Sequence, residues 1–232
     1  MKTSLIMLTY NELEGATALI NRIPFDKVDE IFVVDDGSTD GTIDFLRNRG
    51  IKVIIQKLKG RGEAFKLGFK EAAHDNLIFF SLDGNENPDD IPKFKQYFEQ
   101  SCDLVIASRM RKDSRNEEDD NFFKPRKWAN NCFNLFINVV WNKDLGNNFI
   151  TDSINGLRGI TRAAWEKMRP DAGGYTIEYQ TTIRAMKLGL KIREFSTYEF
   201  NRIGGESYAK SIPTGISFLK LLFNELLIGL KF

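Results

Sequence analysis

Two pairs of oxygen-bearing side chains stand where an apolar run gives way to turn residues. Asp35 and Asp36 follow the apolar run 31–34, and Asp83 and Asn85 follow a second such run. Carboxylates in these positions accept hydrogen bonds from hydroxyl and N–H groups, and carboxylate and amide oxygens bind hard cations. Open α/β sheets bind ligands where their strands end at the carboxyl side. A polar ligand site is therefore expected at these two strand ends.

The segments around these side chains alternate between short apolar runs and helical patterns. Strands are expected at 4–8, 31–34, 51–55, 77–82, 104–107, 154–160 and 190–194. Helices are expected at 11–23, up to residue 49 after the second strand, and at 61–73, 89–100 and 176–188. This alternation predicts an α/β fold with a Rossmann-like, mostly parallel sheet and helices on both faces.

The composition narrows the classes of function. The chain has 232 residues, enough for one domain with a small appendage. Its formal net charge of +1 gives no reason to expect nucleic acid as a partner. Cys102 and Cys132 lack the spacing of metal ligands and are expected as free core thiols in a reducing compartment. No stretch is long and apolar enough for a bilayer span to be expected.

Two motifs carry a resemblance to a known family. Residues 34–42, Val-Asp-Asp-Gly-Ser-Thr-Asp-Gly-Thr, resemble the nucleotide-sugar signature of family 2 glycosyltransferases. Residues 9–12, Thr-Tyr-Asn-Glu, are similar to that family's first motif, although Leu8 stands where proline is usual. The resemblance extends from residue 3 to about 208 and is greatest to the branch of dolichol-phosphate mannose synthases and other polyprenyl-phosphate glycosyltransferases. It implies a GT-A domain over residues 1–208.

The resemblance implies inverting transfer of a sugar from a nucleotide diphosphate sugar to a lipid-linked acceptor such as a polyprenyl phosphate. The residues implied in binding the nucleotide sugar are Tyr10, Asn11, Glu12, Asp35, Asp36, Gly60, Arg61 and Asp83. Gly60 and Arg61 stand at the start of an expected helix, whose N–H groups favour phosphate. Asp83 and Asn85 match the family's Asp-x-Asp, which holds a divalent cation, Mg²⁺ or Mn²⁺. Asn85 brings no charge, so weaker metal affinity is expected.

Further residues are implied in catalysis and in acceptor binding. The candidate catalytic residues are Asp83, Asp152 and Glu178. Glu178 stands six residues before Arg184, the spacing between the catalytic acid and a downstream arginine in many family members. The candidates for binding the acceptor phosphate are Arg109, Arg111, Arg202 and Ser207. A phosphate acceptor is already anionic at neutral pH, so it needs cations more than a general base.

Two amphipathic segments follow the first five expected strands. Residues 128–140 place large apolar residues and Cys132 on one helical face and asparagines on the opposite face. Residues 216–232 are apolar around most of the helix circumference. This pattern fits a helix in a membrane interface, and the resemblance implies a lipid acceptor. Residues 209–232 are therefore expected to bind the membrane, which would make the protein cytoplasmic and peripheral at the inner face of the membrane. Packing of this helix on the domain or in a homo-oligomer is the alternative.

The residues leave other functions open. A transferase to a sugar hydroxyl of a growing glycan would need a general base, for which Glu178 is the candidate. A catalytically inactive homologue that binds a nucleotide or glycan is favoured by Asn85 in place of an aspartate. A sugar nucleotidyltransferase is less favoured, because its glycine-rich loop would follow the first strand, where this chain has Tyr10, Asn11 and Glu12.

Overall fold

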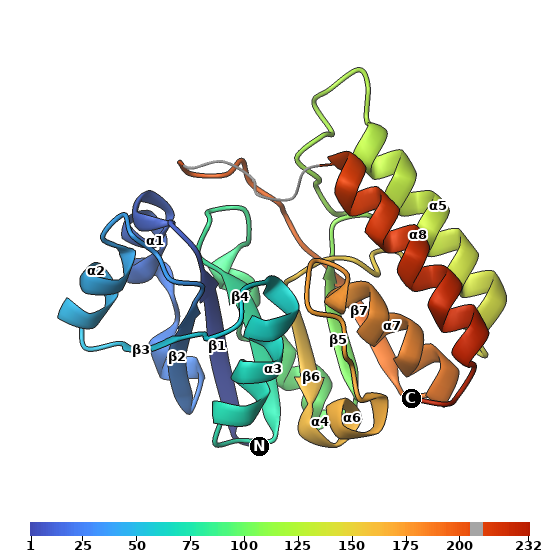
Figure 1. The fold of residues 1–232 in the computed structure, drawn as a ribbon, viewed down its shortest axis with the longest axis horizontal. Helices are drawn as coiled ribbons and strands as arrows, with labels where there is room; N and C mark the ends of the chain where they lie inside the picture. The colour runs from blue at the N-terminus through green and yellow to red at the C-terminus, as the bar shows by residue number, and fades with distance from the viewer. Residues whose placement is uncertain (205–210) are drawn as a thin grey trace.

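A seven-stranded sheet crosses the molecule in the order β3-β2-β1-β4-β6-β5-β7 (Figure 1). The structure, a computed structural model, describes residues 1–204 and 211–232. The strands are β1 Thr3–Thr9, β2 Glu30–Asp35, β3 Lys52–Ile55, β4 Asn76–Ser81, β5 Leu104–Ser108, β6 Arg158–Thr161 and β7 Ile192–Ser196. Neighbouring strands pair in parallel except at β6, which is antiparallel to β4 and β5. The predicted mostly parallel sheet is confirmed.

Helices join the strands and cover both faces of the sheet (Figure 1). The α-helices are α1 Leu13–Leu19, α2 Thr42–Asn48, α3 Arg61–Glu71, α4 Lys93–Glu99, α5 Pro125–Trp141, α6 Arg162–Met168, α7 Ile177–Leu188 and α8 Ser211–Ile228. Short 3₁₀ segments are η1 Ile20–Arg22, η2 Phe25–Lys27 and η3 Pro88–Asp90. The helix predicted at 11–23 is therefore divided into α1 and η1, and the sequence analysis missed α6. Pro125 begins α5, and Gly189 ends α7 in a left-handed conformation.

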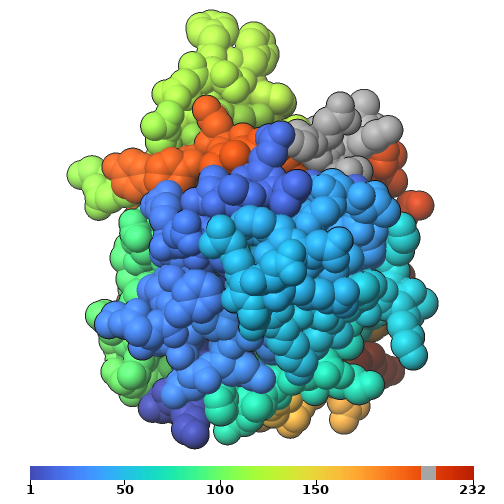
Figure 2. Space-filling view, turned by 90° about the vertical axis from the view of Figure 1, so that its left-hand side faces the viewer, coloured from blue at the N-terminus to red at the C-terminus, as the bar shows by residue number. Residues whose placement is uncertain are grey.

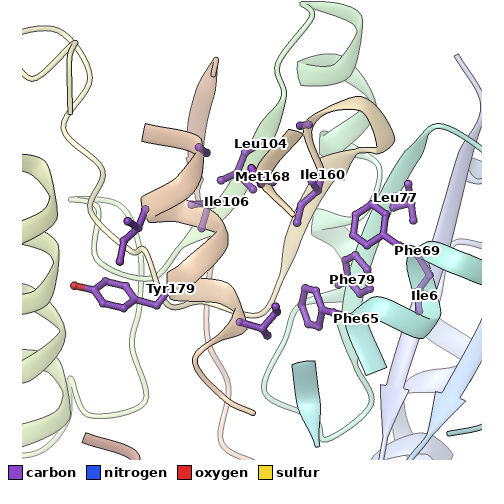
Figure 3. Packing of buried hydrophobic residues seen from close by; sticks show 14 of the residues in the cluster. Ile6, Phe65, Phe69, Leu77, Phe79, Leu104, Ile106, Ile160, Met168 and Tyr179 are labelled. Carbon is purple, nitrogen blue, oxygen red and sulfur yellow. The ribbon is translucent and has the colours of Figure 1, made fainter. Parts of the chain in front are cut away.

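The alternating side chains of the central strands enter two separate cores. Ile6 of β1 packs in a cluster with residues of α3, α6 and α7, whereas Leu5 and its neighbours pack in a cluster with residues of α1, α2 and α4. Figure 3 shows the first cluster, in which the rings of Phe65 and Phe79 stack with their centroids 4.0 Å apart. Burial on both faces explains the continuous apolar run of β1, every residue of which is buried.

Helix α5 is amphipathic, as predicted, but its asparagine face is the one that packs inward. Asn134 and Asn138 are buried, and Asn138 exchanges hydrogen bonds of 2.8 and 2.9 Å with the backbone of Ile150. The exposed apolar residues of α5 are Trp128, Leu135, Phe136, Val139 and Val140. Cys132 is also exposed, so the prediction of a core thiol is wrong there, whereas Cys102 is buried.

Helix α8 lies beside α5 and packs on α7 (Figure 1). The ring of Phe218 lies 5.6 Å from that of Phe133 in α5 and 5.3 Å from that of Tyr179 in α7, centroid to centroid. The opposite side of α8 is exposed and apolar, with Ile216, Leu219, Phe223, Leu226 and Leu227. Across residues 1–204 and 211–232, no helix has the length and apolar character required to cross a bilayer.

A late segment crosses the ends of the first strands. Figure 2 shows residues 198–204, in orange, lying over the N-terminal part of the chain, in blue. The Ile203 N–H donates to the Asp83 carbonyl at 2.9 Å, and the Phe200 N–H donates to the Asn85 carbonyl at 2.9 Å. Gly84 has a φ of +93°, and a Cβ there would lie 2.6 Å from the Ile203 side chain. Glycine at position 84 therefore lets this segment reach the strand ends.

Candidate functional site

A cavity of about 460 Å³ opens at the carboxyl ends of β1, β2 and β4. The chain reverses its direction across the sheet between β1 and β4, so the cavity lies at a topological switch point, where open α/β sheets bind ligands. Seven of the predicted site residues line it: Tyr10, Glu12, Asp36, Gly60, Arg61, Asp83 and Arg202. Its lining also includes Gln56, Lys59, Ser81, Gly174 and Tyr175, which the sequence analysis did not assign to the site.

The two adjacent aspartates after β2 have different environments. Asp35 is fully buried, and its carboxylate accepts hydrogen bonds from the Thr9 hydroxyl at 2.7 Å and from two backbone N–H groups of the following turn. Asp36 lines the cavity and accepts from the Gln56 amide at 2.7 Å and from the Gly60 N–H at 3.3 Å. In this arrangement Asp35 holds the turn, whereas Asp36 faces the cavity.

Asn11 likewise forms hydrogen bonds with the turn after β2 and does not line the cavity. Its side-chain oxygen accepts from the Thr39 N–H at 2.8 Å, and its own N–H donates to the Ser38 hydroxyl at 2.8 Å. It has a φ of 53°, a left-handed conformation that asparagine tolerates better than most residues. Tyr10, one residue earlier, does line the cavity, and the Lys59 ammonium lies 5.5 Å from its ring centroid.

Arg202 joins two carboxylates that come from different strand ends. Its guanidinium forms ion pairs with Glu12 and, at 3.2 Å, with Asp83. Burial and the nearby Asp83 raise the pKa of Glu12 from 4.5 to about 7, although Arg202 acts in the opposite direction. Two carboxyl groups and one guanidinium therefore lie together in the lining of the cavity.

A second ion pair joins Arg61, which lines the cavity, to the candidate base Glu178. Arg61 at the start of α3 pairs with Glu178 at the start of α7 and donates to the Ser81 hydroxyl at 3.2 Å. The side chain of Glu178 is only 2% exposed. Burial and the nearby Asp83 raise the pKa of the partly buried Glu86 to about 8, although Arg61 lowers it. A Cβ at Gly156 would lie 2.0 Å from an Arg61 nitrogen, so glycine at 156 leaves room for the guanidinium.

The predicted phosphate ligand Arg109 is paired with carboxylates in this structure. Its guanidinium donates to both oxygens of Asp152, at 2.7 and 3.0 Å, and to Glu199 at 2.8 Å. Asp152 is fully buried and is held in turn by Glu194, which accepts its N–H at 2.9 Å. Burial raises the pKa of Glu194 to about 7. Neither Arg109 nor Asp152 lines the cavity. Arg109 joins the segment after β5 to Asp152, which precedes β6, and to Glu199, which follows β7.

The remaining predicted residues have other positions. Arg111 is exposed on the loop after β5. Ser207 lies outside the described residues. Arg184 is buried and bonds Glu225 of α8, away from the cavity. The expected helix N-terminus at Gly60 to Gly62 is partly occupied, because the Gly62 N–H donates to the Gly173 carbonyl at 3.1 Å.

Asp83 and Asn85 offer two oxygens to a cation. The Asn85 side-chain oxygen is buried and has no hydrogen-bond partner, while its amide nitrogen lies 3.5 Å from a Glu117 oxygen. Within the described part of the chain, no three histidine, cysteine or acidic side chains form a group suited to a metal ion. Mg²⁺ is usually held by one or two protein carboxylates together with substrate phosphates and water. One carboxylate with one unpartnered amide oxygen fits a cation of that kind.

Comparison with known families shows which family the chain belongs to. The family model described as "Glycosyl transferase family 2" matches residues 4–162. The chain belongs to glycosyl transferase family 2. The resemblance of its first motifs is thereby confirmed, and this protein is a glycosyltransferase.

Relatives of this glycosyltransferase include proteins named for transfer to polyprenyl phosphate. It is 29% identical over 218 residues to undecaprenyl-phosphate mannosyltransferase of Micrococcus luteus, covering 89% of this chain and 87% of the relative. It is 28% identical over 157 residues to undecaprenyl-phosphate 4-deoxy-4-formamido-L-arabinose transferase of Yersinia pestis, covering 62% of this chain and 46% of the relative. Both relatives are named for transfer to a polyprenyl phosphate, as is the branch to which the sequence resemblance points.

Solved structures share the fold at lower identity. Glucosyl-3-phosphoglycerate synthase of Mycobacterium tuberculosis, crystallised with Mn²⁺, uridine diphosphate and phosphoglyceric acid, matches with a TM-score of 0.76 at 20% identity. The match covers 96% of this chain and 78% of that one. The same enzyme crystallised with Mg²⁺ and uridine diphosphate matches with a TM-score of 0.71. This likeness confirms the GT-A fold of the present glycosyltransferase.

Proposed function

We propose that this protein transfers a sugar, with inversion, from a nucleotide diphosphate sugar to a polyprenyl phosphate. The observation that carries the proposal is the cavity at the switch point, in which Asp36 and Asp83 lie near the cations Arg61 and Arg202. Its volume falls within the range of small-molecule sites. The named activity of the Micrococcus luteus relative, which aligns over most of both chains, supports the choice of acceptor.

The donor is bound by groups from three strand ends. Asp36 accepts hydrogen bonds from N–H or hydroxyl groups of the nucleoside, and the Tyr10 ring offers an apolar face to the base. Asp83 and Asn85 would hold a divalent cation, Mg²⁺ or Mn²⁺, and the neighbour crystallised with Mn²⁺ and uridine diphosphate supports this assignment. Such a cation would supply positive charge to the leaving diphosphate.

A phosphate acceptor suits the paired state of Glu178 better than a hydroxyl acceptor does. An anionic phosphate oxygen attacks the anomeric carbon directly, a new carbon–oxygen bond forms, and the bond to the nucleotide diphosphate breaks, so no proton needs to be removed. A sugar hydroxyl would need a general base within reach. Glu178 is buried and already paired with Arg61, which favours a role in holding Arg61. Arg202, which lines the cavity, is a cation that can contact an incoming phosphate.

The outward faces of α5 and α8 support contact with a membrane, where a polyprenyl phosphate resides. Large apolar side chains are normally buried, yet on α5 Asn134 and Asn138 face the core, whereas Trp128, Leu135, Phe136, Val139 and Val140 face outward. The neighbouring α8 adds a second exposed apolar face (Figure 1). Lys124, Arg126 and Lys127 stand at the start of α5, where they form ion pairs with Asp119 and Glu117. We propose that residues 209–232 act with α5 as a peripheral membrane element.

A donor and acceptor panel tests the function. Uridine and guanosine diphosphate sugars are incubated with undecaprenyl phosphate in detergent, with and without Mn²⁺, and glycolipid formation is measured. Cation-dependent transfer to the lipid phosphate is expected for at least one donor. Transfer to a sugar hydroxyl with the lipid phosphate ignored would contradict the proposal. Nucleotide binding without any transfer would favour the inactive homologue that Asn85 leaves open.

A further inference from the structure

The apolar helix α8 contains a buried carboxylate, Glu225. Its side chain is fully buried between α8 and α7. It accepts hydrogen bonds from Arg184 at 2.8 Å, from Lys187 at 2.6 Å and from the Gln180 amide at 3.1 Å, all of which belong to α7. Burying a charge is costly unless it is paired and hydrogen-bonded, and a simple helix contact needs no such group. The other contacts of its partners on α7 indicate a second role for Glu225.

Two of these partners also hold the segment 168–172, which leads from α6 towards the cavity. The Gln180 side-chain oxygen accepts the N–H groups of Asp171 at 2.9 Å and of Ala172 at 2.8 Å. Arg184 donates to the Asp171 carboxylate at 2.8 Å and to the carbonyl of Arg169. Arg169 has a φ of 45°, which is unfavourable for a residue with a Cβ and needs support from its surroundings.

The same segment continues into the wall of the donor cavity. Gly174 and Tyr175 line the cavity, and the preceding Gly173 carbonyl accepts the Gly62 N–H at 3.1 Å. A Cβ on Gly62 would lie 2.0 Å from the Ala172 carbonyl oxygen, so segment and helix are in direct backbone contact. Gly62 follows Arg61, which pairs with Glu178. Contacts therefore run without a break from Glu225 to the start of α3.

We propose that Glu225 is a positioning residue for the donor cavity. Through Gln180 and Arg184 it fixes residues 168–172, and these place Gly173, Gly174 and Tyr175 against the start of α3. The contacts of Glu225 with Gln180 and Arg184 then favour the shape of the cavity that binds the nucleotide. This inference rests on the proposed function in taking the ligand of that cavity to be a nucleotide diphosphate. Because binding energies are reciprocal, nucleotide binding in turn stabilises these contacts of Glu225.

The test measures the segment and the ligand separately. Glu225→Gln keeps the shape of the side chain and removes its charge, and Gln180→Leu removes the ties to Asp171 and Ala172 without removing any charge. Hydrogen exchange of amides 171–176 is measured in the nucleotide-free protein. Affinities for uridine and guanosine diphosphate are measured with Mn²⁺. Both variants are expected to exchange faster at 171–176 and to bind the nucleotide roughly fivefold or more weakly, the usual range of coupling between sites.

Two control variants separate positioning from general loosening of α8. Lys187→Met removes another partner of Glu225. Beyond α7 itself, the described hydrogen bonds of Lys187 are made with Glu225, Gly229 and Lys143, and none is made with residues 168–172. Asn224→Ala changes an exposed residue of α8. Both controls are expected to exchange as wild type at 171–176. Equal acceleration in Lys187→Met, or no acceleration in Gln180→Leu, would overturn the inference, and Gln180→Leu decides alone should Glu225→Gln not fold. A wild-type protein that binds neither nucleotide would instead contradict the proposed function, with the exchange result still deciding the role of Glu225.

Discussion

The carboxylate of Glu178 forms an ion pair with the guanidinium of Arg61, and the pair joins the start of α7 to the start of α3. Glu178 occupies the position at which the family resemblance places a catalytic acid. Only 2% of its side chain is exposed, and its carboxylate contacts the Arg61 guanidinium. This leaves it poorly placed to contact an acceptor hydroxyl. The pairing orients Arg61, which does line the cavity. The contact therefore favours a role for Glu178 in holding Arg61 over a role as a general base.

Replacement of Glu178 by glutamine distinguishes these two roles. Glutamine keeps the shape of the side chain but cannot act as a base, so turnover with a phosphate acceptor is expected to fall only modestly. A general base contributes on the order of 100- to 10,000-fold. Turnover is measured at saturating donor, with Glu166→Gln on the exposed side of α6 as a control for the loss of a carboxylate. A fall within the general-base range, together with use of a hydroxyl acceptor, would contradict the phosphate assignment.

The adjacent aspartates Asp35 and Asp36 are expected to respond differently to replacement by alanine. Asp35→Ala leaves the Thr9 hydroxyl and turn N–H groups without their acceptor, so it should lower the free energy of unfolding by on the order of 1–3 kcal/mol. Asp36→Ala should chiefly weaken nucleotide binding. Urea denaturation measures the first effect, and the ligand-induced rise in melting temperature measures the second. The same result at both positions would contradict the division of roles.

Stabilisation by nucleotide also tests the cation site. A nucleotide diphosphate at about 100-fold excess over its dissociation constant should raise the free energy of unfolding by roughly 2.7 kcal/mol. Asp83→Ala should remove the part of this rise that depends on Mn²⁺ or Mg²⁺, because Asp83 is the charged member of the pair with Asn85. Thermal melts with and without the cation measure it. A cation-dependent rise that persists in Asp83→Ala would place the cation elsewhere.

The sequence predicted the strands, the sheet and the edge at which the site lies, because apolar periodicity and turn residues are local signals. It did not separate Asp35 from Asp36, since the direction in which each carboxylate points depends on the turn that follows β2. The ion pairs of Arg109 could not be predicted from the sequence, because its partners, Asp152 and Glu199, are distant in the chain. Tyr175 belongs to no motif, and it lines the cavity together with residues that are distant in the chain. Periodicity marked α5 as amphipathic but gave no sign of which face is inward.

The raised pKa of Glu86 predicts a pH dependence of stability. The folded protein binds this proton up to about pH 8, whereas the group titrates near 4.5 when unperturbed. The folded state therefore holds more protons than the unfolded state between these values, and the contribution of Glu86 to the free energy of unfolding falls as pH rises through this window. Glu86→Gln, which stays neutral, should show a smaller fall in urea denaturation across the window. The same change at exposed Glu99 is the control, and equal slopes in wild type and Glu86→Gln would contradict the prediction.

Membrane association should depend on the outward residues of both α5 and α8. Cutting the chain after Ser211 would leave Arg184 and Lys187 buried without Glu225, so the loss of α8 would confound membrane binding with stability.

Val139→Glu on α5 and Leu227→Glu on α8 instead place a charge on side chains that are 66% and 73% exposed. Each change is expected to reduce flotation with anionic liposomes, because a charged group opposes entry into the apolar part of the interface and is repelled by anionic lipid. Phe25→Glu, at an exposed aromatic residue of η2, is the matched control and should float as wild type does. Unchanged flotation in both helix variants would indicate that these faces bind another protein and not a membrane. Loss of flotation in both variants, with normal flotation of Phe25→Glu, would locate the membrane contact on α5 and α8.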